Sequence, residues 1–212
     1  MSKELHAKFH RNDRIEMFSD GVFAIVVTLL VFQITVPVLK DARSFSELIH
    51  ELILIKGKFI SFVLSFCFIV MLWVAHNIWF RTLARTDSVV LWVNNLFLLL
   101  VCFVPFPTAL IGSYPANSAA MILFGTDWAL IAVVMYFVGR YCFNKGFVLQ
   151  GVDRKRYKEA LTVMGIILPF SVVPIAISIW YPEVALLFYL LQVIAGIIIS
   201  FRIRVEDAME EL

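Results

Sequence analysis

Residues 21–39 form an uncharged run that begins directly after a polar and charged cluster. Within the run only Thr28, Gln33 and Thr35 are polar. A helix needs about 20 mostly apolar residues to cross the hydrocarbon core of a bilayer, so this run predicts a membrane-spanning helix. Asp20 would then lie at the membrane boundary, where a carboxylate is costly unless it is paired or hydrated. It is therefore a candidate functional residue.

The composition indicates an integral membrane protein. The 212 residues are 61% hydrophobic and 16% charged, with a mean hydropathy of +0.90, whereas soluble domains are about 45–50% apolar and about 25% charged. Cys67, Cys102 and Cys142 lie far apart in apolar runs and fit neither a metal site nor a disulfide framework. Residues 1–13 lack the apolar core of a cleavable signal peptide, so we expect the first span to act as its own insertion signal.

We predict a single all-α domain over residues 1–212, with six spanning helices and both termini in the cytoplasm. The expected spans are residues 16–39, 59–80, 88–111, 118–141, 160–180 and 183–201. Residues 1–13 form the expected cytoplasmic N-terminus, 59–203 hold the five further helices, and 204–212 form the cytoplasmic tail. Pro105 and Pro107 are expected to kink or end the third span.

The link at residues 40–58 predicts an extracellular amphipathic helix. Ser44 and Glu47 fit a capping box at its start. The apolar residues that share one face at helical spacing are Phe45, Leu48, Ile49, Leu52 and Ile53. We expect this helix on the membrane surface or over the outer mouth of the protein.

The basic residues orient the expected bundle. With a cytoplasmic N-terminus, all but four of the 18 lysines and arginines lie inside, which is the positive-inside pattern. The four outside are Lys40, Arg43, Lys56 and Lys58. The basic link at residues 153–158 either binds anionic lipid of the inner leaflet or serves only as a topology signal. We expect membrane lipid, and no nucleic acid, as a partner.

One face of the first helix is mostly bulky and apolar and carries one hydroxyl. The residues on it, at i, i+4, i+7, i+8 and i+11, are Gly21, Ile25, Thr28, Leu29 and Phe32. Several copies around an axis would enclose a narrow apolar tube with one ring of threonine hydroxyls, and such constrictions gate by dewetting. The alternative is lipid contact or core packing, because every spanning helix has apolar stripes.

Polar residues in three expected spans fall at one cytoplasmic-side depth, which predicts a hydrogen-bonded cluster. Its members are Arg14, Ser19 and Asp20 in the first helix, Trp73, His76 and Asn77 in the second, and Asn94 and Asn95 in the third. The cluster either locks the helices together, or forms a water-accessible vestibule or a proton relay through Asp20 and His76. Asp127 in the fourth span is either a proton or ion site or a carboxylate that reaches water at the outer end.

No enzyme class is favoured. The sequence has no P-loop and no His-Glu-x-x-His motif, and it lacks the paired aspartates or Ser/His dyad deep in a span that an intramembrane hydrolase would need. It also lacks the Thr-Val-Gly-Tyr-Gly filter of carbonyl-lined potassium channels. We expect no cofactor and no fixed metal site.

Two motifs resemble a known family. Arg14-x-x-x-Phe18-Ser19-Asp20-Gly21, continued by Ala24-Ile25-x-x-Thr28-Leu29, resembles the first helix of the endo-lysosomal potassium channel transmembrane protein 175, and its shorter prokaryotic relatives more closely. Trp73-x-x-His76-x-x-x-Phe80 in the second helix is also similar to the family. The resemblance covers the whole chain in architecture and is sharpest in the first helix.

The resemblance implies a potassium-permeable cation channel without a P-loop filter, built as a homotetramer in the plasma membrane of a prokaryote. The first helix would line the pore, with Ile25 as the hydrophobic constriction and Thr28, Leu29 and Phe32 continuing the lining. Phe32 is bulkier than the aliphatic residue we would expect there. Permeant K⁺ and other monovalent cations would pass near Ile25 and Thr28, and the polar cluster would fix the pore helix.

Two other classes stay open. One is a proton-permeable channel or proton-coupled transporter that uses Asp20 and His76. The other is a non-conducting membrane scaffold or lipid-binding protein.

Overall fold

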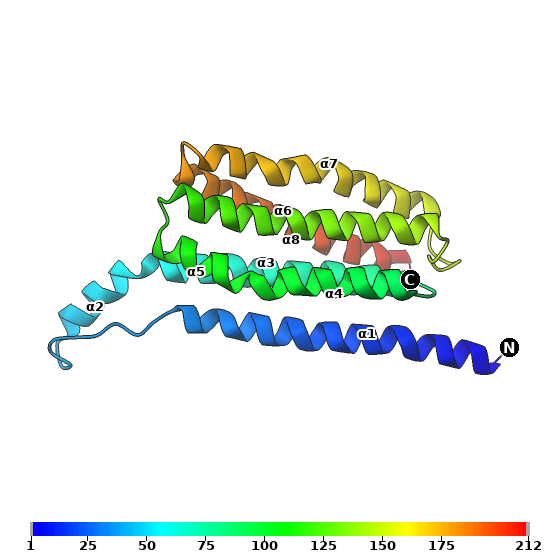
Figure 1. Cartoon of the computed structure of the whole chain (residues 1–212), viewed down its shortest axis with the longest axis horizontal. Coiled ribbons are helices and arrows are strands. Elements are labelled where there is room, and N and C mark those ends of the chain that lie inside the picture. The colour runs from blue at the N-terminus through cyan, green and yellow to red at the C-terminus, as the bar shows by residue number, and fades with distance from the viewer. Residues whose placement is uncertain (1, 211–212) are drawn as a thin grey trace.

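The apolar runs form long helices that lie side by side along one direction (Figure 1). The computed structural model describes residues 2–210, and the side chains of residues 12–198 except 156, 163, 166 and 167. Met1 and residues 211–212, at the ends of the expected N-terminus and tail, lie outside the described residues. In chain order the elements are α1 (Ser2–Leu29), the 3-10 helix η1 (Leu30–Gln33), α2 (Phe45–Leu54), α3 (Lys56–Arg81), α4 (Ser88–Phe103), α5 (Pro105–Ser113), α6 (Ser118–Asn144), α7 (Arg154–Ser178) and α8 (Pro182–Glu210).

The all-helical class is confirmed. Among the described residues, four helical stretches are long and apolar enough to cross a membrane: Asn12–Gln33, Lys56–Arg81, Ser88–Ser113 and Ser118–Asn144. Two shorter apolar helical stretches, Leu168–Ser178 and Pro182–Ile198, lie in α7 and α8. They occupy the places of the fifth and sixth expected spans, and Pro169 and Pro174 lie inside α7.

The helix α1 lies at one side of the bundle, against α3 and α4, while α6, α7 and α8 form the other side (Figure 1). A core of buried side chains joins the two sides. In it, Phe68 of α3 stacks on Trp128 of α6 at 3.6 Å between ring centroids. The hydroxyl of Tyr189 on α8 donates to the carbonyl of Met121 at 3.3 Å. Aromatic rings and paired polar groups thus fill the interior of the bundle.

The first helix has different limits from those expected. Helical backbone begins at Ser2 instead of residue 16, and residues 2–15 contain neither proline nor glycine to prevent it. It ends at Gln33 instead of residue 39, and Ile34 is extended. Pro37 explains the early end, since proline disfavours helix in the residue before it and its ring clashes with the carbonyl four residues back.

The third expected span divides at Val104 into α4 and α5, as Pro105 and Pro107 predicted. Gln33 at the end of η1 donates its side-chain N–H to the carbonyl of Pro105. The division is held on a second side, because the Ser65 hydroxyl lies 2.7 Å from the Thr108 hydroxyl, which donates to the carbonyl of Val104. The outer end of α1 is therefore tied to the break between α4 and α5.

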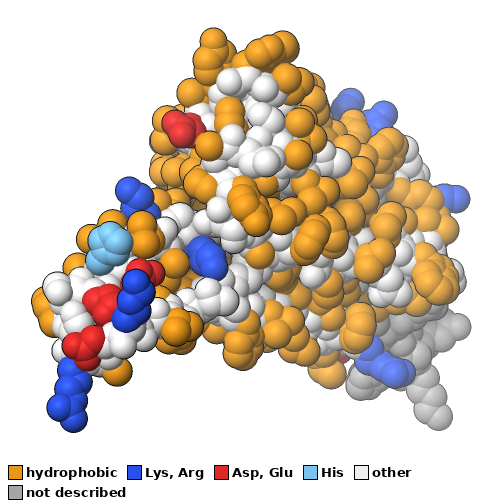
Figure 2. Space-filling view, turned by 60° about the vertical axis from the view of Figure 1, so that its left-hand side comes forward, with side chains coloured by type: hydrophobic (Ala, Val, Ile, Leu, Met, Phe, Trp, Pro, Cys, Tyr) orange, Lys and Arg blue, Asp and Glu red, His pale blue; other side chains and the backbone are white. Residues whose placement is uncertain are grey.

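The helix α2 and the chain before it project from the bundle as an arm, residues 34–54 (Figure 1). No residue of α2 is buried. Figure 2 shows hydrophobic side chains over most of the visible face of the bundle, and charged side chains gathered on the projecting arm. This separation fits a bundle that faces hydrocarbon and an arm that faces water or lipid headgroups.

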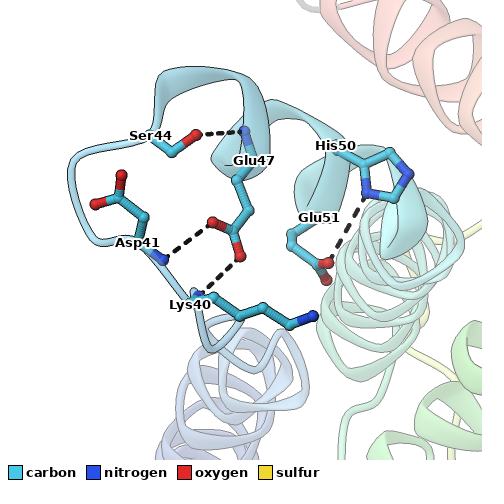
Figure 3. Close-up of polar contacts among 6 residues, drawn as sticks. All are labelled: Lys40, Asp41, Ser44, Glu47, His50 and Glu51. Carbon is cyan, nitrogen blue, oxygen red and sulfur yellow. Dashed lines mark hydrogen bonds and ion pairs between the residues drawn. The ribbon is translucent and has the colours of Figure 1, made fainter.

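Half of the expected capping box forms at the start of α2 (Figure 3). The Ser44 hydroxyl accepts from the N–H of Glu47 at 3.3 Å. The Glu47 carboxylate does not return to Ser44, whose N–H already donates to the carbonyl of Asp41. It accepts instead from the N–H groups of Lys40 and Asp41, at 2.8 and 3.1 Å, and these two bonds hold the pKa of Glu47 below its ordinary value.

We predict that this carboxylate orders the start of the arm. Because its folded-state pKa is depressed, its stabilising effect is present above the unfolded pKa and is lost as the pH falls through the folded pKa. Glu47→Gln should speed hydrogen exchange of peptides covering residues 38–47 several-fold at pH 7, measured by mass spectrometry. Glu51→Gln is the matched control, because Glu51 contacts only His50 on the arm, at 3.8 Å, among the described side chains. Equal acceleration in both variants would contradict the assignment.

Candidate functional site

Two opposite faces of α1 have opposite environments. Ser19, Val26 and Leu30 are 0–2% exposed and pack into the bundle. The opposite face is uncovered, with Ile25 at 60%, Leu29 at 46% and Phe32 at 77% exposed, and Gly21 and Thr28 are exposed beside them. All five residues of the predicted pore face therefore lie on the side of α1 that the rest of the chain leaves open.

The hydroxyl of Thr28 has one hydrogen-bonding role inside its own helix. It donates to the carbonyl of Ile25 at 2.8 Å. A hydroxyl has one donor and two acceptor sites, so this bond leaves the oxygen lone pairs of Thr28 free to accept or to coordinate. The uncovered face thus presents one oxygen donor for a cation, set between apolar side chains.

A directional chain of hydrogen bonds fixes the buried face to α3 and α4. The Ser19 hydroxyl donates to the carbonyl of Ile15 at 2.8 Å, and it accepts from the side-chain N–H₂ of Asn94 at 3.1 Å. The oxygen of Asn94 then faces Nε2 of His76 at 2.8 Å. Since that oxygen can only accept, Nε2 must carry the proton.

The imidazole of His76 is enclosed by aromatic rings. It is 2% exposed and stacks on Phe97 at 5.5 Å, with Phe80 at 4.5 Å and Phe23 at 5.8 Å between ring centroids. These contacts and the bond to Asn94 leave the ring no freedom to turn toward the uncovered face of α1. The geometry suits a structural anchor.

Asp20 makes a second, separate attachment. Its carboxylate accepts from the indole N–H of Trp73 on α3 at 2.8 Å. Among the described residues, no hydrogen bond joins Asp20 to His76, so the two candidate proton carriers belong to different branches. Together the branches attach α1 directly to α3 at Trp73 and to α4 at Asn94, which is bonded in turn to His76 of α3.

The other predicted members of the cluster are not joined to it. Arg14 is exposed, while Asn77 and Asn95 are half-buried, and within the described side chains none of the three makes a hydrogen bond. Asp127 lies on α6, on the other side of the bundle from α1 (Figure 1). It is 4% exposed, so it does not reach water as one of our two readings expected.

Sequence reasoning missed Asn12. Its side chain donates to the carbonyl of Leu83 at 3.3 Å and accepts from the Thr86 hydroxyl at 2.9 Å, and it is 9% exposed. These bonds attach the start of the apolar stretch Asn12–Gln33 to the turn between α3 and α4. Asn12 lies in a polar stretch that gives no local signal of burial, and only the helical backbone through it brings it to that turn.

Comparisons with known proteins show that this helix and its anchor are similar to one family of channels. The family profile described as "Endosomal/lysosomal potassium channel TMEM175" matches residues 14–105, which include the uncovered face of α1 and both branches of the anchor. The crystal structure of a lysosomal potassium-selective channel TMEM175 homolog from Chamaesiphon minutus superposes with a TM-score of 0.81 and 29% identity, covering 90% of this chain and 98% of that one. The chain is therefore similar to TMEM175 channels in sequence over residues 14–105 and in fold over 90% of its length.

Two curated TMEM175-like relatives are named potassium channels. One, from Chamaesiphon minutus, is 42% identical over 124 residues, which is 57% of this chain and 61% of the relative. The other, from a Chryseobacterium species, is 28% identical over 194 residues, which is 90% of this chain and 95% of the relative. The match to the first relative thus spans about three fifths of its length.

We predict that Asn94→Ala destabilises the fold, because it leaves the Nε2–H of His76 without its acceptor and the hydroxyl of Ser19 without its donor. A buried polar group left unsatisfied costs about 1–3 kcal/mol. The readout is the thermal unfolding midpoint of the purified protein in detergent. Asn95→Ala is the matched control, and we expect its midpoint to stay near that of the parent. A larger loss from Asn95→Ala would contradict the anchor.

Proposed function

We propose that this chain is a potassium-permeable cation channel in which four copies place the uncovered face of α1 around a central pore. The observation that carries the proposal is the division of α1 into a hydrogen-bonded, buried face and an exposed face of Ile25, Thr28, Leu29 and Phe32. The match to a channel family and the potassium-channel names of the relatives support it. An exposed Ile-Leu-Phe stripe alone would also suit lipid, but the similarity to channels favours a pore.

In this proposal each chain spans the membrane six times. Four spans are the stretches that are long and apolar enough to cross a membrane. The fifth and sixth are α7 and α8, whose apolar parts are Leu168–Ser178 and Pro182–Ile198. The basic turns between α3 and α4 and between α6 and α7 lie at the end of the bundle that holds both termini (Figure 1). The positive-inside rule places that end in the cytoplasm, here at the plasma membrane of a prokaryote.

The proposed constriction is a ring of four Ile25 side chains. A narrow apolar ring excludes water until it widens, so conduction would depend on a small outward movement of α1. Potassium gives up its hydration water at a lower cost than sodium does, and the lone pairs of Thr28 next to the ring would replace part of that water. We therefore propose modest selectivity for K⁺, passive transport, and neither a cofactor nor a fixed metal site.

We predict that Ile25→Asn raises K⁺ flux several-fold and lowers the preference for K⁺ over Na⁺, because an amide ring stays hydrated. The purified protein is reconstituted in liposomes with an outward K⁺ gradient, with valinomycin and a protonophore as controls. Ile194→Asn on α8 is the matched control, since Ile194 is 51% exposed and lies away from α1 in the chain. If Ile25→Asn conducts like the parent, the constriction lies elsewhere. Flux of protons alone would favour the proton-channel alternative.

We predict four chains per particle. Native mass spectrometry of the protein released from detergent should give tetramers as the main species, since a pore lined by one helix from each chain needs a closed ring of copies. Phe32→Glu should shift the population toward smaller species by charge repulsion around the axis. A parent that is mainly monomeric or dimeric would contradict the tetramer.

A further inference from the structure

One end of the bundle carries a cluster of exposed cations, here called the basic collar. The turn between α3 and α4 and the link between α6 and α7 meet there in an antiparallel bridge between Leu83 and Val148. Two backbone hydrogen bonds flank the bridge, from Ala84 to Phe147 at 2.8 Å and from Leu149 to Thr82 at 2.9 Å. The collar consists of Arg85, Arg140, Lys145, Arg154, Lys155 and Lys158, all exposed.

The end of α6 shows how the sequence builds this bridge. Gly146 has φ +65°, a left-handed conformation that a side chain disfavours. Its N–H donates to the carbonyl of Phe143, and the N–H of Phe147 donates to the carbonyl of Cys142, which is the Schellman arrangement. The chain therefore reverses after α6, buries Phe147, and brings the cations of the link beside those of the α3–α4 turn.

Three of the six collar cations lie on aromatic rings. Arg85 lies over Phe147 at 4.9 Å, Lys145 over Tyr141 at 5.7 Å and Arg154 over Phe143 at 5.5 Å. In the part of the chain whose side chains are described, the ion pair between His50 and Glu51 is the only one, and it belongs to the arm. Rings hold a cation in place without neutralising it. The six cations also outnumber the neighbouring acids Asp87, Asp153 and Glu159, so the collar keeps a net positive charge.

An exposed apolar strip continues from the collar along the helices. Val89, Trp92 and Leu96 on α4 are 45%, 72% and 48% exposed, and Phe137 on the neighbouring α6 is 65% exposed. Trp92 lies about 6 Å along the axis from the start of α4, by the rise of 1.5 Å per residue. Tryptophan at that depth is typical of the membrane interface, which puts the collar at the level of the lipid headgroups.

We propose that the basic collar binds the headgroups of anionic phospholipids, whose acyl chains lie along the apolar strip of α4 and α6. Anionic phospholipid fits both parts, because it carries a phosphate charge next to two hydrocarbon chains. A water-soluble acidic protein or nucleic acid would use the cations and leave the strip unused. Asn12 joins the collar turn to α1 through Leu83 and Thr86, so bound lipid also holds α1 at the start of its apolar stretch.

The test measures lipid binding, so it does not depend on ion conduction. The full-length protein is placed in phosphatidylcholine vesicles that contain either brominated phosphatidylglycerol or brominated phosphatidylcholine at one mole fraction. Quenching of Trp92 is isolated by subtracting the signal of Trp92→Phe. We expect stronger quenching by brominated phosphatidylglycerol in the parent, and equal quenching by the two lipids in the triple variant Arg85→Gln, Arg140→Gln, Lys145→Gln.

The expected change is large, because each basic residue near an anionic surface favours binding by roughly fivefold. The triple variant Lys40→Gln, Arg43→Gln, Lys56→Gln is the charge-matched control. It removes three exposed cations from the opposite end of the bundle, before α2 and at the start of α3, and it should keep the preference. If the collar variant does not fold, parent protein at 1 M salt serves, where screening should abolish the preference. Equal quenching in the parent, loss in the control variant, or a preference that survives 1 M salt would each overturn the proposal.

Discussion

The hydrogen bonds that attach α1 to α3 and α4 set the rotation of that helix about its own axis, and the rest of the molecule depends on this rotation. In hydrocarbon no water competes for Ser19, Asn94 or His76, so each of these groups must find its partner within the protein. The face opposite the bonds is then the face that the bundle leaves open. A rotation of α1 about its axis by one residue position, about 100°, would break these hydrogen bonds. It would also bring a different set of side chains to the open face.

Three further attachments restrict the same helix along its length. Asn12 joins the start of the apolar stretch Asn12–Gln33 to the α3–α4 turn, Asp20 joins its middle to Trp73, and Gln33 joins its end to the α4–α5 break. The turn is itself fixed by the bridge at the collar, α3 by the aromatic core, and the break by the hydrogen bond between Ser65 and Thr108. Movement of α1 is therefore most easily a tilt or bend of the whole helix, and changes at either end reach the other.

The sequence predicted the helical class, the break at Pro105, the cap at Ser44 and the shared depth of Ser19, His76 and Asn94. The depth of a residue in the membrane follows from its position along a helix of known rise. Residues far apart in the chain can therefore be assigned to the same level. Counting could not separate Asn94 from Asn95, because adjacent residues share a depth and differ in direction by about 100°. It also placed the end of the first helix too late, since residues 34–39 are as apolar as a span and only Pro37 signals extended chain. Nothing in the sequence pointed to Asn12, whose burial depends on a turn more than 70 positions later.

The two ends of the chain lie at the same end of the bundle (Figure 1). A second copy joined to the first by a peptide would keep the first copy's orientation, because the peptide would not need to cross the membrane. Duplication by tandem fusion is therefore open to this fold at no topological cost, whereas a bundle with ends on opposite sides would need an extra helix. The same placement makes linked dimers and tetramers practical, so that a single altered copy of α1 can be set among unaltered ones in a known order.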